Sequence, residues 1–264
     1  MTDPLGVCSI ADGERLAIIC PVRLREEWLI AEQAAAFFFP EGTRWTTLLE
    51  VRLNDLHGKS AGNIDVVLVA YDEAGQITDF GSLEVQSVYI SGNLRKAFFK
   101  PYSDDPEAYL AADWPAMRKT NPRPDYLSSS RKRLAPQMIY KGGIFQTWGR
   151  KQAVAVHSAF YATLPELREV AKEEADLAWL LYDLLYDETS RRYRLTPTRT
   201  VYTQFKPTLE KITLAEAGPV STFLLNLQSK LNSKLTGASA SQLTDIPLDV
   251  PADETDLIET LENF

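Results

Sequence analysis

The chain has 264 residues, of which 45% are hydrophobic and 10% aromatic, so it is long enough to bury a sizeable core in one domain with additions. Its formal net charge is −8, and it contains only two cysteines and two histidines, which excludes a disulfide scaffold and leaves little room for a zinc site of His and Cys ligands. No apolar run approaches the ~18–20 residues that span a bilayer, and no secretory signal begins the chain, so we expect a cytoplasmic protein without a membrane partner.

Hydrophobic periodicity and turn residues predict a mixed architecture for the first part of the chain. In order, we expect a helix at 24–39, a half-buried strand at 46–53, hairpin strands at 63–71 and 77–90, an irregular stretch at 100–125 with a short helix near 106–114, a helix at 129–148 and a buried strand at 152–161. This order predicts an α+β fold, an α/β sandwich in which helices flank a central mixed sheet.

The C-terminal part of the chain predicts three further elements. Residues 166–187 have the pattern of an amphipathic helix, with Trp179 and several leucines on its core face. Residues 193–205 suggest an extended hairpin or strand pair, and residues 220–235 a final helix. A tail follows, in which residues 241–264 carry seven acidic and no basic side chains.

The predicted hairpin brings two acidic side chains together. If its turn centres near residues 74 and 75, antiparallel pairing places Asp65 opposite residue 83 or 84, at a distance where like charges repel. Glu84 and Gln86 are two residues apart, so they share one face of their strand. Two carboxylates held this close among apolar residues need a shared proton or a cation. The alternative interpretation is a pair of solvated acids at strand ends.

Magnesium is the cation that suits these groups. Mg²⁺ prefers carboxylate, carbonyl and water oxygens, and Asp65, Glu84 and the Val85 carbonyl supply part of such a shell. A metal bound to phosphate polarises it and lowers the pKa of a water molecule. Gln86 could hold the attacking water through its amide oxygen, but it has no basic site for the proton. Glu50, on the preceding strand, is a candidate third carboxylate.

Positive charge is concentrated in the middle of the chain. Residues 91–151 carry twelve basic and five acidic side chains, with basic pairs at 118–119 and 150–151 and aromatic residues among them. This pattern is typical of a phosphate-binding surface, although a solvated basic face fits it as well. We interpret His157 as a core side chain and His57 as part of a surface loop.

The element order that contains Asp65 and Glu84-Val85-Gln86 resembles the PD-(D/E)xK nuclease fold, in the branch that carries Gln where most members have Lys. More narrowly, Pro-Leu-Gly-Val-Cys at residues 4–8, followed by Ala-Ile-Ile-Cys-Pro at residues 17–21, resembles the NotI-type restriction endonucleases. The resemblance covers roughly residues 4–161, and the combination of the two motifs is specific.

The resemblance implies a homodimeric type II restriction endonuclease that uses Mg²⁺, with Mn²⁺ as a substitute, to cut both strands of DNA at a defined site and to leave 5′-phosphate and 3′-hydroxyl ends. Asp65 and Glu84 match the metal-binding acids, Gln86 the residue in the lysine position, and Glu50 an additional active-site acid. The DNA-contact candidates are Arg131, Lys132, Arg133, Arg191, Arg192 and Arg194, of which the last three also fit a charged surface hairpin.

Composition, expected elements and the resemblance together predict four segments in the chain. These are an N-terminal segment with a partial cysteine motif at 1–23, a nuclease core at 24–161, a helical and hairpin extension for DNA recognition or dimerisation at 162–240, and the acidic tail at 241–264.

The sequence departs from the family in its cysteines. NotI-type enzymes hold a structural iron with four cysteines, whereas only Cys8 and Cys20 are present here, and two thiolates do not close a tetrahedral site. Either an upstream pair lies outside this sequence or it has been lost, so we expect no iron, with Cys8 and Cys20 at most as residual ligands. Two further functions fit the residues: a structure-specific or repair nuclease of the same fold, and a DNA-binding module whose nuclease site is inactive.

Overall fold

The computed structural model describes residues 8–13, 15–93, 96, 100–111, 122–215 and 217–237. Four stretches used in the sequence analysis lie outside these residues: the motif half at 4–7, the end of the helix expected near 106–114, the basic pair at 118–119 and the acidic tail at 241–264. The chain divides into two compact units, Met1–Thr213 and Leu214–Phe264. None of the described helices is long and apolar enough to cross a membrane.

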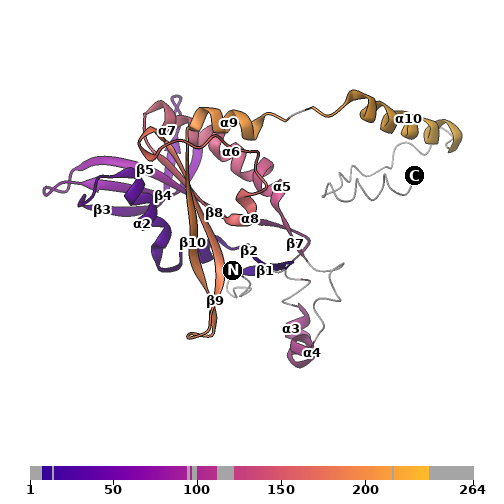
Figure 1. The fold of residues 1–264 in the computed structure, drawn as a ribbon, viewed down its shortest axis with the longest axis horizontal. Coiled ribbons are helices and arrows are strands. Elements are labelled where there is room, and N and C mark those ends of the chain that lie inside the picture. Colours follow the sequence, from indigo (N-terminus) through magenta and orange to yellow (C-terminus); the bar gives the residue numbers. More distant parts are fainter. Residues whose placement is uncertain are drawn as a thin grey trace. The chain divides into compact units, whose positions relative to one another are not determined.

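The first unit is built on one six-stranded mixed sheet (Figure 1). Its strands are β3 (Trp45–Asn54), β4 (Ser60–Tyr71), β5 (Ile77–Gln86), β8 (Gln152–His157), β9 (Leu177–Asp187) and β10 (Arg192–Thr203). They lie in the order β10-β9-β8-β5-β4-β3, in which β5, β8 and β9 are parallel and the other neighbours antiparallel. The expected central mixed sheet is confirmed.

Helices cover both faces of this sheet. One face packs against α1 (Pro21–Leu24) and α2 (Leu29–Phe38). The other face packs against a helix at 126–147, together with α8 (Ser158–Tyr161) and α9 (Phe205–Thr213). The 126–147 helix consists of α5 (Tyr126–Ser128), η4 (Ser129–Leu134), α6 (Ala135–Gln137), η5 (Met138–Gly142) and α7 (Gly143–Thr147), and both η4 and η5 are π-helical.

The remaining elements lie around this core or in the second unit. They are β1 (Ser9–Asp12), β2 (Arg15–Ile18), η1 (Glu26–Trp28), β6 (Tyr89–Ser91), α3 (Lys100–Asp104), α4 (Pro106–Ala111), β7 (Arg123–Asp125), η6 (Lys172–Glu174) and α10 (Val220–Gly237). The pair β1–β2 and the pair β6–β7 form two small antiparallel sheets. The expected helices at 129–148 and 220–235 are confirmed as the 126–147 helix and α10.

The helix expected at 166–187 is wrong, because the second half of that segment is strand β9, which lies between β10 and β8 in the sheet. Alternate side chains of β9 are buried on opposite faces: Leu180 and Tyr182 pack with α2, whereas Leu177 and Trp179 pack with the 126–147 helix. A nearly continuous apolar run is typical of a parallel strand that helices cover on both faces. Burial of both faces of this segment therefore favours a strand, although its leucines are spaced as in a helix.

The helix expected at 24–39 is broken near its start. Glu27 and Trp28 have φ of 51° and 56°, in the left-handed region that such residues rarely occupy, so η1 separates α1 from α2. Two consecutive left-handed residues persist only where surrounding contacts hold them. Those contacts come from the β9–β10 hairpin, which lies far away in the sequence and could not enter a local prediction.

Three other expected elements differ at their ends. The strand expected at 77–90 stops at the end of β5, and its last residues form β6, which belongs to another sheet. The strand expected at 152–161 ends with β8, and α8 follows it. The segment 193–205 is a single strand, β10, and its partner is β9. The central sheet thus continues past the segment boundary expected at residue 161, and the two compact units divide after Thr213.

Candidate active site

The β4–β5 hairpin places Asp65 and Glu84 side by side, as the sequence predicts. The strands pair antiparallel with Val66 opposite Leu83, and the same register sets the two acids next to each other. The turn is fixed by Asp72, whose Oδ1 accepts two backbone N–H groups of the turn. Asp65 is anchored by a hydrogen bond of 2.8 Å from the backbone N–H of Val85 to its Oδ2.

Glu84 is nearly buried, and its two oxygens have different surroundings. Its side chain is 12% exposed, and Oε2 lies 2.5 Å from Nζ of Lys141. Oε1 is buried and has no hydrogen-bond partner in the structure. Burial raises the pKa of Glu84 to about 7, with the nearby Asp65 adding to the shift and Lys141 opposing it. A buried carboxylate oxygen without a partner, beside a second carboxylate, fits a hard divalent cation.

The other ligands of such a cation would have to include backbone oxygen. Among the described residues, no three His, Cys, Asp or Glu side chains converge as a ready-made ligand set. The chain therefore offers Asp65, Glu84 and the carbonyl of Val85, which is the incomplete oxygen shell that Mg²⁺ commonly completes with water.

Asp65, Val85 and Gln86 open into a hollow of about 200 Å³. The residues that line it are Pro21, Arg25, Glu50, Asp65, Val85, Gln86, Ser87, Arg133 and Gln137. Gln86 is 5% exposed, and its Nε2 donates a hydrogen bond of 2.6 Å to the carbonyl of Ser87. The donor side of this amide is therefore engaged, and its oxygen is the group that can accept from a molecule in the hollow.

Glu50 lines the same hollow but faces a cation. Glu50 lies on β3 opposite Asp65 of β4, at a position where the regular pairing of the two strands is interrupted. Its φ is 53°. Its Oε1 is 3.7 Å from Nη2 of Arg25, and its side chain is 59% exposed. The structure thus brings Glu50 to the site as an exposed carboxylate next to Arg25, at the rim of the carboxylate pair.

Two arginines line the hollow together with its two carboxylates. Nε of Arg25 is buried without a partner, although its Nη2 approaches Glu50. Arg133 extends over the ring of Tyr89, with 4.5 Å between the guanidinium carbon and the ring centroid. Its neighbours on the 126–147 helix, Arg131 and Lys132, are exposed. Of the three basic residues predicted there, Arg133 is the one that lines the hollow.

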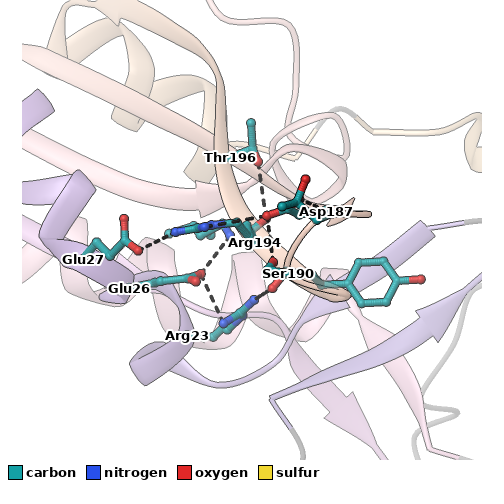
Figure 2. Close-up of polar contacts among 10 residues, drawn as sticks. Arg23, Glu26, Glu27, Asp187, Ser190, Arg194 and Thr196 are labelled. Atoms are coloured by element: carbon teal, nitrogen blue, oxygen red, sulfur yellow. Dashed lines mark hydrogen bonds and ion pairs between the residues drawn. The ribbon is translucent and has the colours of Figure 1, made fainter.

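The β9–β10 hairpin carries the other predicted cations away from the carboxylate pair. Figure 2 shows Arg194 between Glu27 and Asp187, with nitrogen–oxygen distances of 2.7 and 3.7 Å. In the same network Arg23 contacts Glu26 at 3.1 Å. These contacts join the hairpin to the broken helix at η1.

Two further residues at the hairpin tip, Arg191 and Arg192, are exposed. Because of these positions, we assign Arg194 a structural ion-pair role and keep Arg191 and Arg192 as DNA-contact candidates.

Lys141 and Arg25 are site residues that the sequence pattern did not predict, and Lys141 contacts the carboxylate pair directly. It comes from η5, is almost fully buried, and donates to the carbonyl of Asn63 at 2.9 Å as well as to Glu84. The sequence signal of Lys141 is its spacing of four residues from Gln137, which is itself four residues from Arg133, so that all three share one face of the 126–147 helix.

The histidines and cysteines take positions outside the carboxylate pair. His157 is buried at the end of β8, with Nε2 3.3 Å from Asp183, and burial lowers its pKa. Its predicted core position is confirmed, and His57 is exposed after β3. Cys8 and Cys20 are free and half-buried, and burial and the nearby Cys20 thiol raise the pKa of Cys8.

The comparison with protein families gives one match. The family model described as "Restriction endonuclease NotI" matches residues 1–195 of the chain. A search of curated proteins found no match. The matched region contains β1 to β9, and with them both carboxylates, Gln86, Lys141 and the residues that line the hollow.

Proposed function

The chain belongs to the NotI restriction endonuclease family, and we propose that it is a type II restriction endonuclease that hydrolyses both strands of DNA at a defined sequence, with Mg²⁺ as cofactor and 5′-phosphate and 3′-hydroxyl ends as products. The observation that carries this proposal is the pair Asp65 and Glu84, in which Asp65 lines a hollow that also holds two arginines and Glu84 has one buried carboxylate oxygen without a partner. The arrangement of both acids and Gln86 on an antiparallel hairpin also supports a PD-(D/E)xK core.

The carboxylate pair would hold the metal. Oε1 of Glu84, Oδ1 of Asp65 and the carbonyl of Val85 are hard ligands of the kind that Mg²⁺ prefers. When bound, Mg²⁺ supplies Lewis-acid polarisation of the phosphate and a water of lowered pKa. Mn²⁺ suits the same oxygen ligands and is expected to substitute.

The remaining groups bind and orient the substrate. Arg25 and Arg133 flank the hollow and are suited to the oxygens of one or two DNA phosphates, because a guanidinium binds such oxygens through a planar pair of donors. Gln86 can orient a water through its amide oxygen but cannot take its proton at neutral pH. The proton therefore passes to solvent or to an oxygen of the substrate phosphate.

Glu50 would compete with DNA phosphate for Arg25. With no DNA bound, its carboxylate is the anion next to the arginine. A phosphate in the hollow would compete with Glu50 for the same guanidinium, and Glu50 would then be free to act as the additional acid of the site.

We propose that the residues of this sequence do not by themselves hold a structural iron. A four-thiolate iron site needs four cysteines, and this sequence supplies Cys8 and Cys20. Metal analysis of the purified protein should give no stoichiometric iron, and one iron per chain would contradict this proposal.

The direct test is digestion of plasmid and phage DNA with Mg²⁺. We expect discrete fragments from linear DNA, and we expect Glu84→Gln and Asp65→Asn to reduce cleavage by more than about 100-fold. The matched control is Glu41→Gln, an exposed acid after α2, which should cut as the unchanged protein does. Intact DNA across many sequences, or full cleavage by Glu84→Gln, would contradict the proposal, and a smear in place of bands would favour a structure-specific nuclease.

A further inference from the structure

We infer that Lys141 is a positioning residue of the active site, whose ammonium group holds one oxygen of Glu84 so that the other is presented to the metal. This inference rests on the proposed nuclease function, since it concerns how that site is ordered. It adds to the site a cation from a helix, whereas the hairpin strand itself carries Gln86 at the position where most members of the wider fold that the sequence resembles have lysine.

The contacts of Lys141 define this role. Its side chain is 7% exposed, and Nζ donates to Oε2 of Glu84 at 2.5 Å and to the carbonyl of Asn63 at 2.9 Å. A buried ammonium needs such partners, and these two fix Nζ between β4 and β5. Because Oε2 is engaged, Oε1 is the oxygen that remains buried and unpaired. The lysine and a cation can thus bind Glu84 at the same time, one at each oxygen.

The fold holds Lys141 in this place. Its neighbour Gly142 packs so closely that an added Cβ would lie 2.6 Å from the ring of Phe205, and its carbonyl accepts a hydrogen bond of 3.1 Å from Gln152. On the other side, a Cβ on Gly62 would be in ordinary contact with the lysine stem, 3.6 Å from Cδ. The lysine is therefore enclosed between the hairpin and its own helix.

The π-helical turns align Lys141 with the residues that line the hollow. Arg133, Gln137 and Lys141 follow one another at intervals of four residues across η4, α6 and η5. In a regular α-helix of 3.6 residues per turn, such a row drifts around the helix axis. The wider turns of η4 and η5 oppose that drift, so all three side chains reach the site, and π-helical turns are frequent at functional sites.

A competing role for Lys141 predicts the opposite result. If the lysine merely filled the place of the metal, its removal would free Oε2 and strengthen metal binding. If it positions Glu84, its removal leaves a buried carboxylate without its anchor and weakens metal binding. The sign of the change in metal affinity therefore separates the two roles, independently of DNA cleavage.

The experiment compares Lys141→Met with Lys172→Met, a control at an exposed lysine on η6. DNA-free protein is titrated with Mn²⁺ in a calorimeter, and cleavage is measured with Mg²⁺ and plasmid DNA. We expect Lys141→Met to weaken Mn²⁺ binding by about 10- to 100-fold, as does loss of a group that orients a metal ligand. We also expect kcat to fall by about 100-fold with little change in KM for DNA, because the defect lies in geometry at the metal and not in DNA contact.

Lys172→Met should match the unchanged protein in both measurements. Lys141→Arg keeps a charged donor and should recover part of the lost Mn²⁺ affinity. This variant also tests the role of the lysine if Lys141→Met does not fold. Mn²⁺ binding by Lys141→Met as tight as that of the unchanged protein, or tighter, would overturn the inference, as would an unchanged kcat or an Arg variant that recovers nothing. Failure of the unchanged protein to cut any DNA would instead count against the proposed function itself.

Discussion

Glu84 and Asp65 are kept close together in a nearly buried setting, an arrangement that destabilises the folded protein in the absence of a cation. Lys141 offsets part of this cost, since it pairs with one oxygen of Glu84. A buried carboxylate with a raised pKa beside a second acid is typical of functional sites, where stability is lost in exchange for binding or catalysis. Binding of a ligand therefore explains the carboxylate pair better than a contribution to folding stability does.

The raised pKa of Glu84 predicts how stability depends on pH without metal. Its pKa in the folded protein is about 7, above the ordinary value of 4.5, so folding favours the neutral form of this side chain. The stability that Glu84 contributes is therefore full below pH 4.5 and is lost as the pH rises through 7. We expect the stability of the unchanged protein, relative to Glu84→Gln, to fall by on the order of 3 kcal/mol between pH 4 and pH 8. Denaturant unfolding in a chelator measures this difference, and a difference that is the same at both pH values would contradict the prediction.

Arg25 predicts a change in the salt dependence of DNA binding. If its guanidinium contacts one phosphate, Arg25→Met should weaken binding and reduce the slope of log affinity against log salt by about 1. Binding is measured at several salt concentrations without divalent metal, so that the DNA stays intact. Arg168→Met, at an exposed arginine before β9, is the control and should leave the slope unchanged. An unaltered slope in Arg25→Met would remove Arg25 from the phosphate site.

At the scale of elements, the carboxylate hairpin was predictable and much of its surroundings was not. The pair Asp65 and Glu84 follows from strand pattern, turn residues and pairing register, all of which are local in sequence. Strand β9 was not predictable from its pattern, because an apolar run at helical spacing is shared by a buried strand and an amphipathic helix. Lys141 escaped prediction because its role depends on the packing of its helix against the sheet, which has no local sequence signal.

The 126–147 helix gives a prediction from two adjacent glycines. Gly142→Ala would place Cβ 2.6 Å from the buried ring of Phe205, so we expect a loss of about 1–3 kcal/mol in stability and weaker Mn²⁺ binding as Lys141 shifts. Gly143→Ala meets nothing within 4 Å and should stabilise the protein by about 0.5–1 kcal/mol, because alanine favours helix. Thermal unfolding and Mn²⁺ titration compare the two variants. Equal stability of the two variants would contradict the packing described for Gly142.

At the scale of the whole molecule, the active site depends on parts of the chain that are far apart in sequence. Arg25 precedes the sheet, the carboxylates lie on its hairpin, and Arg133, Gln137 and Lys141 arrive on a helix that follows β5. The described part of the chain carries one such site, so cutting both strands in a single encounter with DNA requires a second chain. This requirement agrees with the homodimer that the family resemblance implies, which stays a proposal.

The homodimer predicts the course of plasmid cleavage. Two active sites acting in one encounter should convert a supercoiled plasmid with one target site to the linear form without accumulation of nicked circles. Sedimentation of the protein should show twice the mass of one chain. Accumulation of nicked circles, together with the mass of a single chain, would contradict a preformed dimer.

Sequencing of the DNA ends produced in Mg²⁺ shows whether the site at Asp65 and Glu84 cuts DNA at a defined sequence. We expect the ends of digested phage DNA to share one short sequence and to carry 5′-phosphates, and we expect Glu84→Gln to yield almost none of them. Ends scattered without a common sequence, or an undiminished yield of the same ends from Glu84→Gln, would contradict this prediction.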